Sequence, residues 1–114
     1  MTDITDPKVA LVELRQRLVD ARGFLDLESK EAELAELREK VSSPDLWDDP
    51  DQARAVSRRL ARYDGLFDKV GGLSSKIDDA EVLLELAAEA GDEGSRQEAL
   101  VELSDVSKEL DDLE

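Results

Sequence analysis

Three carboxylates gather at one predicted turn of this sequence, where Glu89, Asp92 and Glu93 lie beside Gly91 and Gly94. Carboxylate oxygens are ligands for Mg²⁺, so acidic residues at the tip of a helical hairpin could hold a metal ion in another enzyme's active site. The opposing interpretation is structural, because the positive end of a helix dipole favours acidic side chains just before the helix. The sequence favours the structural interpretation.

A row of arginines is the second candidate site. Arg54, Arg58 and Arg62 recur at every fourth position, which places them on one face of a helix, with Arg59 beside them. Such a row could contact RNA phosphates. In so acidic a chain, pairing with glutamates of the preceding helix, or simple solvation, is the favoured explanation.

The residues that most enzymes use are missing. The sequence has no cysteine and no histidine, which excludes disulfides, thiolate metal sites, histidine-based catalysis and the commonest zinc sites. It also has no catalytic triad, glycine-rich phosphate loop or metal-ligand spacing. We therefore expect no catalytic residue, no cofactor and no metal site, and we do not expect an enzyme.

The net charge of the chain limits the classes of partner that it can bind. Residues 1–50 carry 13 acids and 7 bases (net −6), residues 51–90 carry 8 and 6 (net −2), and residues 91–114 carry 9 and 2 (net −7), for a total of −15. DNA, bulk RNA and anionic membranes repel such a chain, and basic proteins suit it better. With no signal peptide and no long apolar run in the sequence, we expect a cytoplasmic protein.

The apolar spacing predicts one long helix over about residues 50–90. Apolar side chains recur there in steps of three and four, which gives the helix a single apolar stripe. Asp49-Pro50 is a start signal for it, as Asp6-Pro7 is for a helix over about 7–22. Asp26 is expected to cap a helix over about 27–42, and Ser95 to open one over about 95–114.

Three short segments refine this picture. Gly23, with Phe24 and Leu25 packing beside it, is predicted to end or bend the first helix. Leu46-Trp47 is predicted to anchor the joint before the long helix, since tryptophan seldom stays exposed. Gly71-Gly72 predicts a bend in an otherwise continuous helix, or a close approach of another helix.

These elements predict an all-α fold. The helices over 27–42 and 95–114 should pack antiparallel on the first and second halves of the long helix, with the first helix covering the remainder. We expect an elongated, coiled-coil-like antiparallel bundle of three to four helices in a single domain over 1–114.

Three segments in order resemble a known family. They are Ala-Arg-Gly-Phe-Leu-Asp at residues 21–26, Pro-Asp-Leu-Trp-Asp-Asp-Pro at 44–50 and Leu-Leu-Glu-Leu-Ala-Ala-Glu-Ala at 83–90. Together they resemble the N-terminal helical domain of bacterial peptide chain release factor 2, over nearly the whole chain. The Pro-Asp-Leu-Trp segment is more similar to factor 2 than to its paralogue, factor 1.

The resemblance implies a role in translation termination at UAA and UGA codons. In that family a Ser-Pro-Phe tripeptide reads the codon and a Gly-Gly-Gln motif promotes peptidyl-tRNA hydrolysis. Here Ser43-Pro44 is followed by aspartate and Gly71-Gly72 by leucine, so both are chance partial matches. The resemblance therefore predicts a non-catalytic domain, the N-terminal fragment of a longer chain.

The resemblance also implies partners, namely the ribosome near the base of the large-subunit stalk, through a ribosomal protein or rRNA, and the remainder of the parent chain. The candidate contact residues are Arg54, Arg58, Arg62, Glu89, Asp92 and Glu93. Two alternatives stay open at this point. One is a stand-alone transcript-cleavage-type hairpin with carboxylates at its tip, and the other is a self-associating coiled-coil module.

Overall fold

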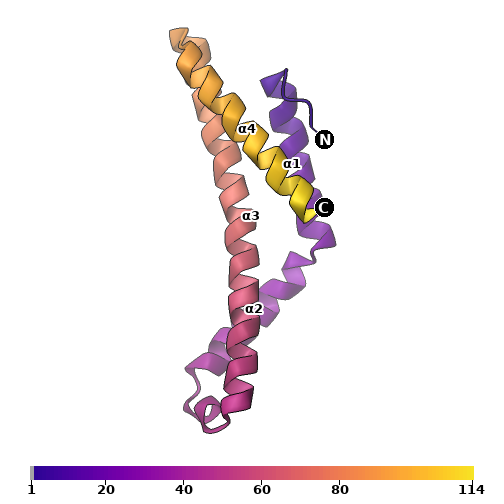
Figure 1. Cartoon of the computed structure of the whole chain (residues 1–114), viewed down its shortest axis with the longest axis vertical. Coiled ribbons are helices and arrows are strands. Elements are labelled where there is room, and N and C mark those ends of the chain that lie inside the picture. Colours follow the sequence, from indigo (N-terminus) through magenta and orange to yellow (C-terminus); the bar gives the residue numbers. More distant parts are fainter. Residues whose placement is uncertain (1) are drawn as a thin grey trace. The chain divides into compact units, whose positions relative to one another are not determined.

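The computed structural model describes residues 2–114, which form α-helices, one 3₁₀ turn and no strand. The α-helices are α1 (Pro7–Phe24), α2 (Leu27–Ser42), α3 (Pro50–Ala90) and α4 (Glu93–Leu113), and the 3₁₀ helix η1 (Pro44–Asp48) precedes α3 (Figure 1). The predicted all-α class and the single long helix are confirmed. Helix α3 is unbroken over 41 residues.

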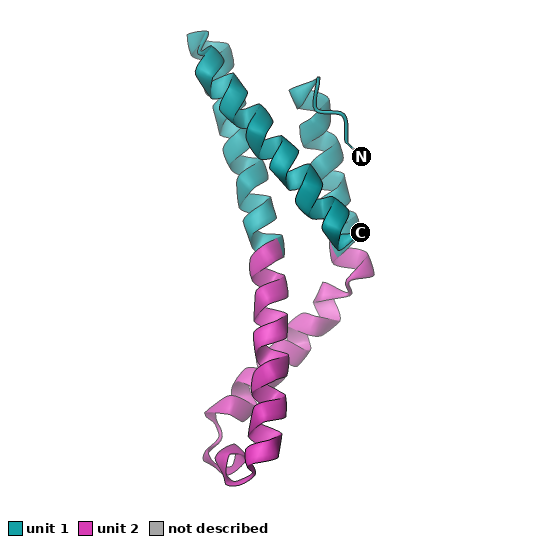
Figure 2. Cartoon of the chain, viewed as in Figure 1, with its two compact units in different colours: residues 1–21, 70–114 teal, residues 22–69 magenta. Residues whose placement is uncertain are grey.

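The chain divides into two compact units, and α3 contributes to both (Figure 2). Unit 1 consists of residues 1–21 and 70–114, so it contains most of α1, the second half of α3 and all of α4. Unit 2 consists of residues 22–69, which include α2, η1 and the first half of α3. Each unit has buried apolar side chains of its own.

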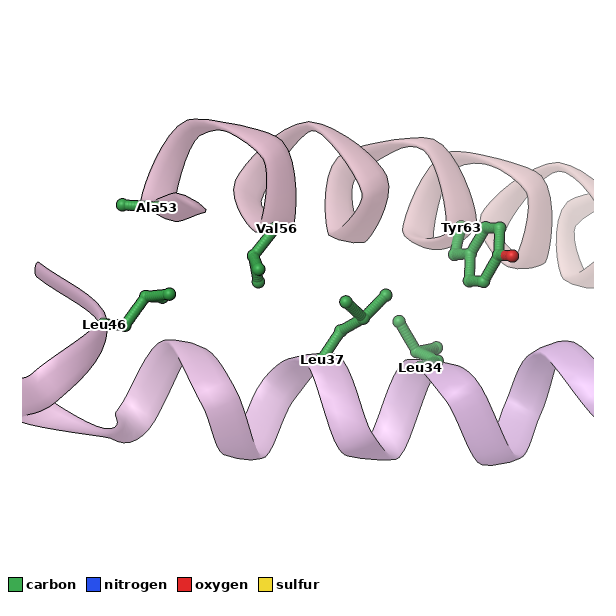
Figure 3. Close-up of a cluster of buried hydrophobic side chains, with 6 residues drawn as sticks. All are labelled: Leu34, Leu37, Leu46, Ala53, Val56 and Tyr63. Atoms are coloured by element: carbon green, nitrogen blue, oxygen red, sulfur yellow. The ribbon is translucent and has the colours of Figure 1, made fainter. Parts of the chain in front are cut away.

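In unit 2, α2 packs antiparallel on the first half of α3. Leu34 and Leu37 of α2 face Val56 and Tyr63 of α3, with all four side chains buried (Figure 3). The cluster is completed by Ala53 and by Leu46 of η1. This apolar seam between α2 and α3 is the arrangement that the helical periodicity predicted.

The two residues of the Leu46-Trp47 pair have different roles. Leu46 is 9% exposed and belongs to the buried cluster, whereas Trp47 is 57% exposed. The prediction that tryptophan anchors the joint was therefore wrong, because the smaller leucine fills that space and the 3₁₀ turn directs its neighbour outward. An exposed tryptophan remains, and the packing of unit 2 does not account for it.

In unit 1, α1 and α4 both pack against the second half of α3. The largest fully buried side chains come from all three helices, with Leu14 from α1, Leu73 and Ile77 from α3, and Leu103 and Leu110 from α4. Helices α1 and α4 run in the same direction and α3 runs in the opposite one (Figure 1). Arg15 of α1 accordingly pairs with Asp78 and Glu81 of α3, at 3.0 and 3.2 Å.

Three of the predicted helix starts hold, and the fourth is displaced by two residues. Asp6 accepts the N–H of Lys8 at 3.2 Å and Asp49 that of Gln52 at 3.2 Å, so these aspartates cap α1 and α3. Helix α2 begins at Leu27 as predicted, with Asp26 at its N-cap position, but the left-handed Asp26, with φ of 53°, makes no side-chain capping bond. Helix α4 begins at Glu93, not Ser95, since Asp92 is its N-cap.

The turn between α1 and α2 also differs from the prediction. Gly23 lies inside α1, and Asp26 is the left-handed residue in the short link between α1 and α2. Aspartate tolerates this conformation better than most residues. Phe24 is exposed and does not pack at this turn, where Leu27 is the buried side chain.

No close contact explains the glycine pair in α3. A Cβ added at Gly71 or Gly72 would meet no atom of another helix within 4 Å. The proposed close approach of another helix at this pair is therefore wrong. Because both residues are helical and exposed, they leave α3 less stable than alanine would, without a packing benefit in return.

Gly71→Ala and Gly72→Ala are therefore expected to stabilise the protein, each by up to about 1 kcal/mol. Urea unfolding followed by circular dichroism measures the change. Gly91→Ala is the matched control and should destabilise, because Gly91 has a left-handed φ of 64°. A loss of stability at Gly72 would contradict the open surroundings found here.

Leu73→Ala is expected to destabilise the protein by about 2–5 kcal/mol, because Leu73 is fully buried in unit 1. Val101→Ala on α4 is the control. Its side chain is exposed, so a change within about 0.5 kcal/mol is expected in the same unfolding experiment. Equal effects for the two variants would contradict the assignment of the buried face.

Candidate functional site

The three predicted arginines lie on the exposed face of the first half of α3. Arg54, Arg58 and Arg62 are all exposed. Arg54 pairs only with Asp51, one turn earlier on the same helix, and among residues 2–114 neither Arg58 nor Arg62 has an ion-pair partner. Of the two branches of the favoured explanation, pairing with glutamates of the preceding helix is not made by these three arginines, whereas a solvated face agrees with their exposure.

The neighbouring Arg59 does make such a pair. Its guanidinium donates to Glu33 of α2 at 2.8 Å and to the Tyr63 hydroxyl at 3.3 Å, and it lies 5.6 Å from the centre of the Tyr63 ring. The Tyr63 hydroxyl donates to Glu33 at 2.6 Å. These contacts, first the hydrogen bond with Tyr63, raise the pKa of Arg59. Arg59 therefore helps to hold α2 on α3. The neighbouring Arg54, Arg58 and Arg62 make no contact of this kind and remain exposed.

A surface cavity of about 480 Å³ adjoins the first two arginines. Trp47 and Pro50 line it together with Arg54, Ser57 and Arg58. The cavity therefore combines an exposed aromatic ring with two guanidinium groups. Sequence reasoning missed it because Trp47 was assigned to the interior.

At the acidic turn, the Asp92 carboxylate caps α4. Asp92 Oδ1 accepts the N–H of Ser95 at 3.3 Å and Asp92 Oδ2 accepts its hydroxyl at 2.9 Å. These bonds, chiefly the one with the hydroxyl, lower the pKa of Asp92. Glu93 accepts from Gln97 at 3.1 Å, and Glu89 is exposed on α3. Within residues 2–114, no cluster of acidic, histidine or cysteine side chains could hold a metal ion.

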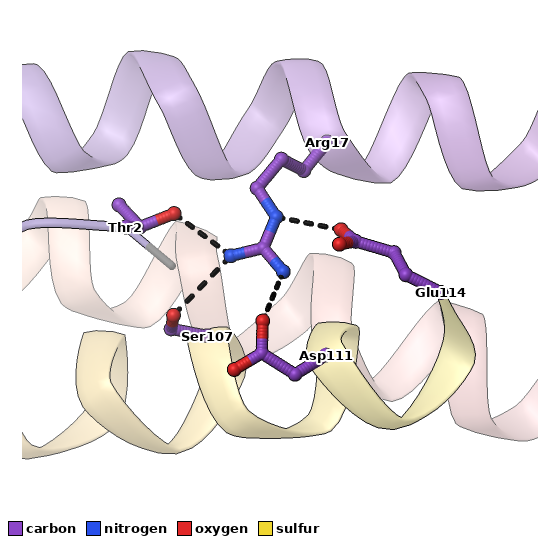
Figure 4. A network of polar contacts seen from close by, with 5 residues as sticks. All are labelled: Thr2, Arg17, Ser107, Asp111 and Glu114. Atoms are coloured by element: carbon purple, nitrogen blue, oxygen red, sulfur yellow. Dashed lines mark hydrogen bonds and ion pairs between the residues drawn. The ribbon is translucent and has the colours of Figure 1, made fainter.

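One further cluster of polar contacts lies in unit 1, around Arg17 of α1 (Figure 4). Its guanidinium donates to Asp111 of α4 and to Glu114, the residue that follows α4, each at 2.7 Å, and to the hydroxyls of Thr2 and Ser107, at 2.8 and 3.2 Å. The Arg17 side chain is only 17% exposed. Its pKa is raised, most strongly by the hydrogen bond with Glu114. This cluster joins α1 to the end of α4 and serves packing.

Glu102 of α4 is a carboxylate whose ionised form is disfavoured in the folded state. Its Oε2 is buried and has no hydrogen-bond partner among residues 2–114. Burial is the main cause that raises its pKa, followed by repulsion from Asp79 and Glu98, while Lys76 acts in the opposite direction. Like charges across α3 and α4 therefore oppose ionisation of Glu102.

Comparison with known proteins identifies the family. The model of the PCRF domain matches residues 30–114, about three quarters of the chain. This chain belongs to the PCRF domain family. The match covers α3 and α4 in full and nearly all of α2.

Its relatives carry the name peptide chain release factor 2. The protein from Acidothermus cellulolyticus is 39% identical over 109 residues, which cover 96% of this chain and 30% of that protein. Those from Salinispora tropica and Haemophilus influenzae are 38% and 33% identical over 114 residues, which cover all of this chain and 30% and 31% of those proteins. The predicted resemblance to release factor 2 is confirmed.

The chain spans about 30% of the length of the release factors that it matches. In the described part, residues 2–114, no helix is both long and apolar enough to cross a membrane.

Glu102→Gln is expected to stabilise the PCRF domain at pH 7, by about 1 kcal/mol. A carboxyl whose pKa is raised in the folded state destabilises that state when ionised, and this penalty disappears as the pH falls below the ordinary value of 4.5. Urea unfolding at pH 7 and at about pH 4 tests the sign. The exposed Glu85→Gln is the control and should change little at either pH. A stabilisation that persists at low pH would contradict the electrostatic cause.

Proposed function

We propose that this chain is the N-terminal helical domain of a class-I peptide chain release factor and acts in translation termination. One observation carries the proposal, namely the PCRF match over residues 30–114. Relatives named release factor 2 that align with 96–100% of the chain support it. The family match and these relatives favour the release-factor interpretation over the transcript-cleavage hairpin and the self-associating coiled coil.

Within this proposal the domain is non-catalytic and the parent factor acts at UAA and UGA codons in the cytoplasm. Codon reading and peptidyl-tRNA hydrolysis then belong to other domains of the factor. The two partial motif matches are consistent with this division. Ser43 is the extended residue before η1, which begins at Pro44, and Gly71-Gly72 lies inside α3.

The contribution of this domain is contact with the ribosome, near the base of the large-subunit stalk. Two surfaces are candidates. The exposed arginines Arg54, Arg58 and Arg62 suit an anionic partner, and the acidic surface of residues 91–114 with Glu89 suits a basic ribosomal protein. Because Asp92 caps α4, substitutions at Glu89 and Glu93 are the cleaner test of the acidic surface.

A chimera tests the proposed function. This chain replaces the segment that it matches in Haemophilus influenzae release factor 2, with which it aligns over its full length. Peptide release from ribosomes is measured at UAA, UGA and UAG codons. Release at UAA and UGA within about tenfold of the parent factor is expected, since tenfold corresponds to a loss of only about 1.4 kcal/mol.

A second chimera is the control for overall folding and contains Leu73→Ala, which weakens unit 1 without altering its surface charge. It should lose release activity at raised temperature before the first chimera does. If the unmutated chimera is folded by circular dichroism yet inactive, the proposed function is wrong. The UAA and UGA assignment is checked separately, by finding Ser-Pro-Phe and Gly-Gly-Gln in the reading frame downstream of codon 114.

A further inference from the structure

The outer face of the first half of α3 carries a row of positive charges. Arg54, Arg58, Arg62 and Lys69 are all exposed. They lie 4, 4 and 7 residues apart, so a helix with 3.6 residues per turn places them on one side. The buried residues of this half of α3 lie on the opposite side, facing α2. We call Arg54, Arg58, Arg62 and Lys69, with Ala61 and Gly65 between them, the basic face.

The side chains between these cations are small. Ala61 and Gly65 are both exposed and lie on the same side of α3 as the arginines. A Cβ at Gly65 would meet no atom within 4 Å, so no contact in the chain requires a glycine there. Glycine inside a helix lowers stability relative to alanine. A partner that approaches the helix backbone would account for both residues.

The charge of the basic face is largely unneutralised. Arg58, Arg62 and Lys69 have no ion-pair partner among residues 2–114, and Arg54 pairs only with Asp51. This contrasts with the chain as a whole, whose net charge is −15. An exposed row of cations in so acidic a chain is complementary to an anionic partner.

Trp47 indicates which kind of anionic partner fits. Its exposed ring lines the same cavity as Arg54 and Arg58, at the N-terminal end of the basic face. Guanidinium groups bind phosphates in bidentate fashion, and aromatic rings stack on unpaired bases. An acidic peptide would use the cations but has no comparable need of the ring.

We propose that the basic face binds RNA, with phosphates on the arginine row and an unpaired base against Trp47. The inference rests on the proposed function and refines it, because it makes ribosomal RNA the component contacted by unit 2. The acidic surface of unit 1 remains the candidate for contact with a ribosomal protein, independently of the basic face. RNA contact is confined to the basic face, because the negative charge of the remainder of the chain repels RNA.

The absence of cysteine from the sequence permits a direct test. Ala61→Cys places one thiol in the middle of the basic face, and Ala35→Cys places one on the exposed surface of α2 in the same unit. Each variant is labelled with an iron–EDTA reagent and mixed with bacterial ribosomes, and hydroxyl radicals are generated. Cleavage of ribosomal RNA at a discrete site is expected from position 61 and not from position 35.

Charge variants in the Ala61→Cys background identify the groups responsible. Arg58→Gln with Arg62→Gln should reduce RNA cleavage at a fixed protein concentration by roughly tenfold or more, and should flatten its dependence on salt. Trp47→Leu should reduce it by a comparable factor through lost stacking. Arg22→Gln is the matched control, because Arg22 is an exposed arginine of the same unit on α1, and it should have no effect.

The outcomes separate this inference from the proposed function. If the chimera releases peptide but position 61 produces no RNA cleavage, or positions 61 and 35 cleave alike, the RNA assignment is overturned and the release-factor role stands. Cleavage that Arg58→Gln with Arg62→Gln leaves unchanged would also overturn it. An inactive but folded chimera contradicts the proposed function, whatever the cleavage pattern.

Discussion

The burial of one continuous apolar stripe on α3 is the constraint on which the other contacts depend. A long amphipathic helix obtains most of its stability in water from packing and little from propensity. Helix α3 also contains Gly65, Gly71 and Gly72, which weaken it further. Its first half is covered by α2 and its second half by α1 and α4. The polar contacts of Arg59 and Arg17 then hold helices that burial has already brought together.

The fold followed from the sequence because its signals are local and repeated. Steps of three and four along α3 identify the buried face, and Asp-Pro pairs mark two helix starts. The errors arose where one residue competes with its neighbour. The anchor position before α3 was assigned to the Leu46-Trp47 pair, of which only Leu46 is buried, and Asp92 took the capping position assigned to Ser95. Spacing alone does not decide such competitions, because both candidates satisfy the pattern.

The candidate site was only partly predictable for a related reason. The arginine row was visible in the sequence, but which arginines are paired depends on the register of α2 against α3. In that register Arg59 pairs with Glu33, whereas Arg58 and Arg62 have no ion-pair partners among residues 2–114. The Arg17 cluster had no sequence signal, since Arg17 and its α4 partners are about ninety residues apart in the chain.

The position of Trp47 also determines what the protein's own fluorescence can report. It is the sole tryptophan of the sequence, and its ring is largely in solvent in the folded state. Unfolding therefore changes its surroundings less than it would change those of a buried ring, and its emission is a weaker measure of stability. The same ring is a sensitive reporter of anything that covers the surface of η1 and the start of α3. The chain thus contains a built-in optical probe of contact at this surface, with little background from the cores.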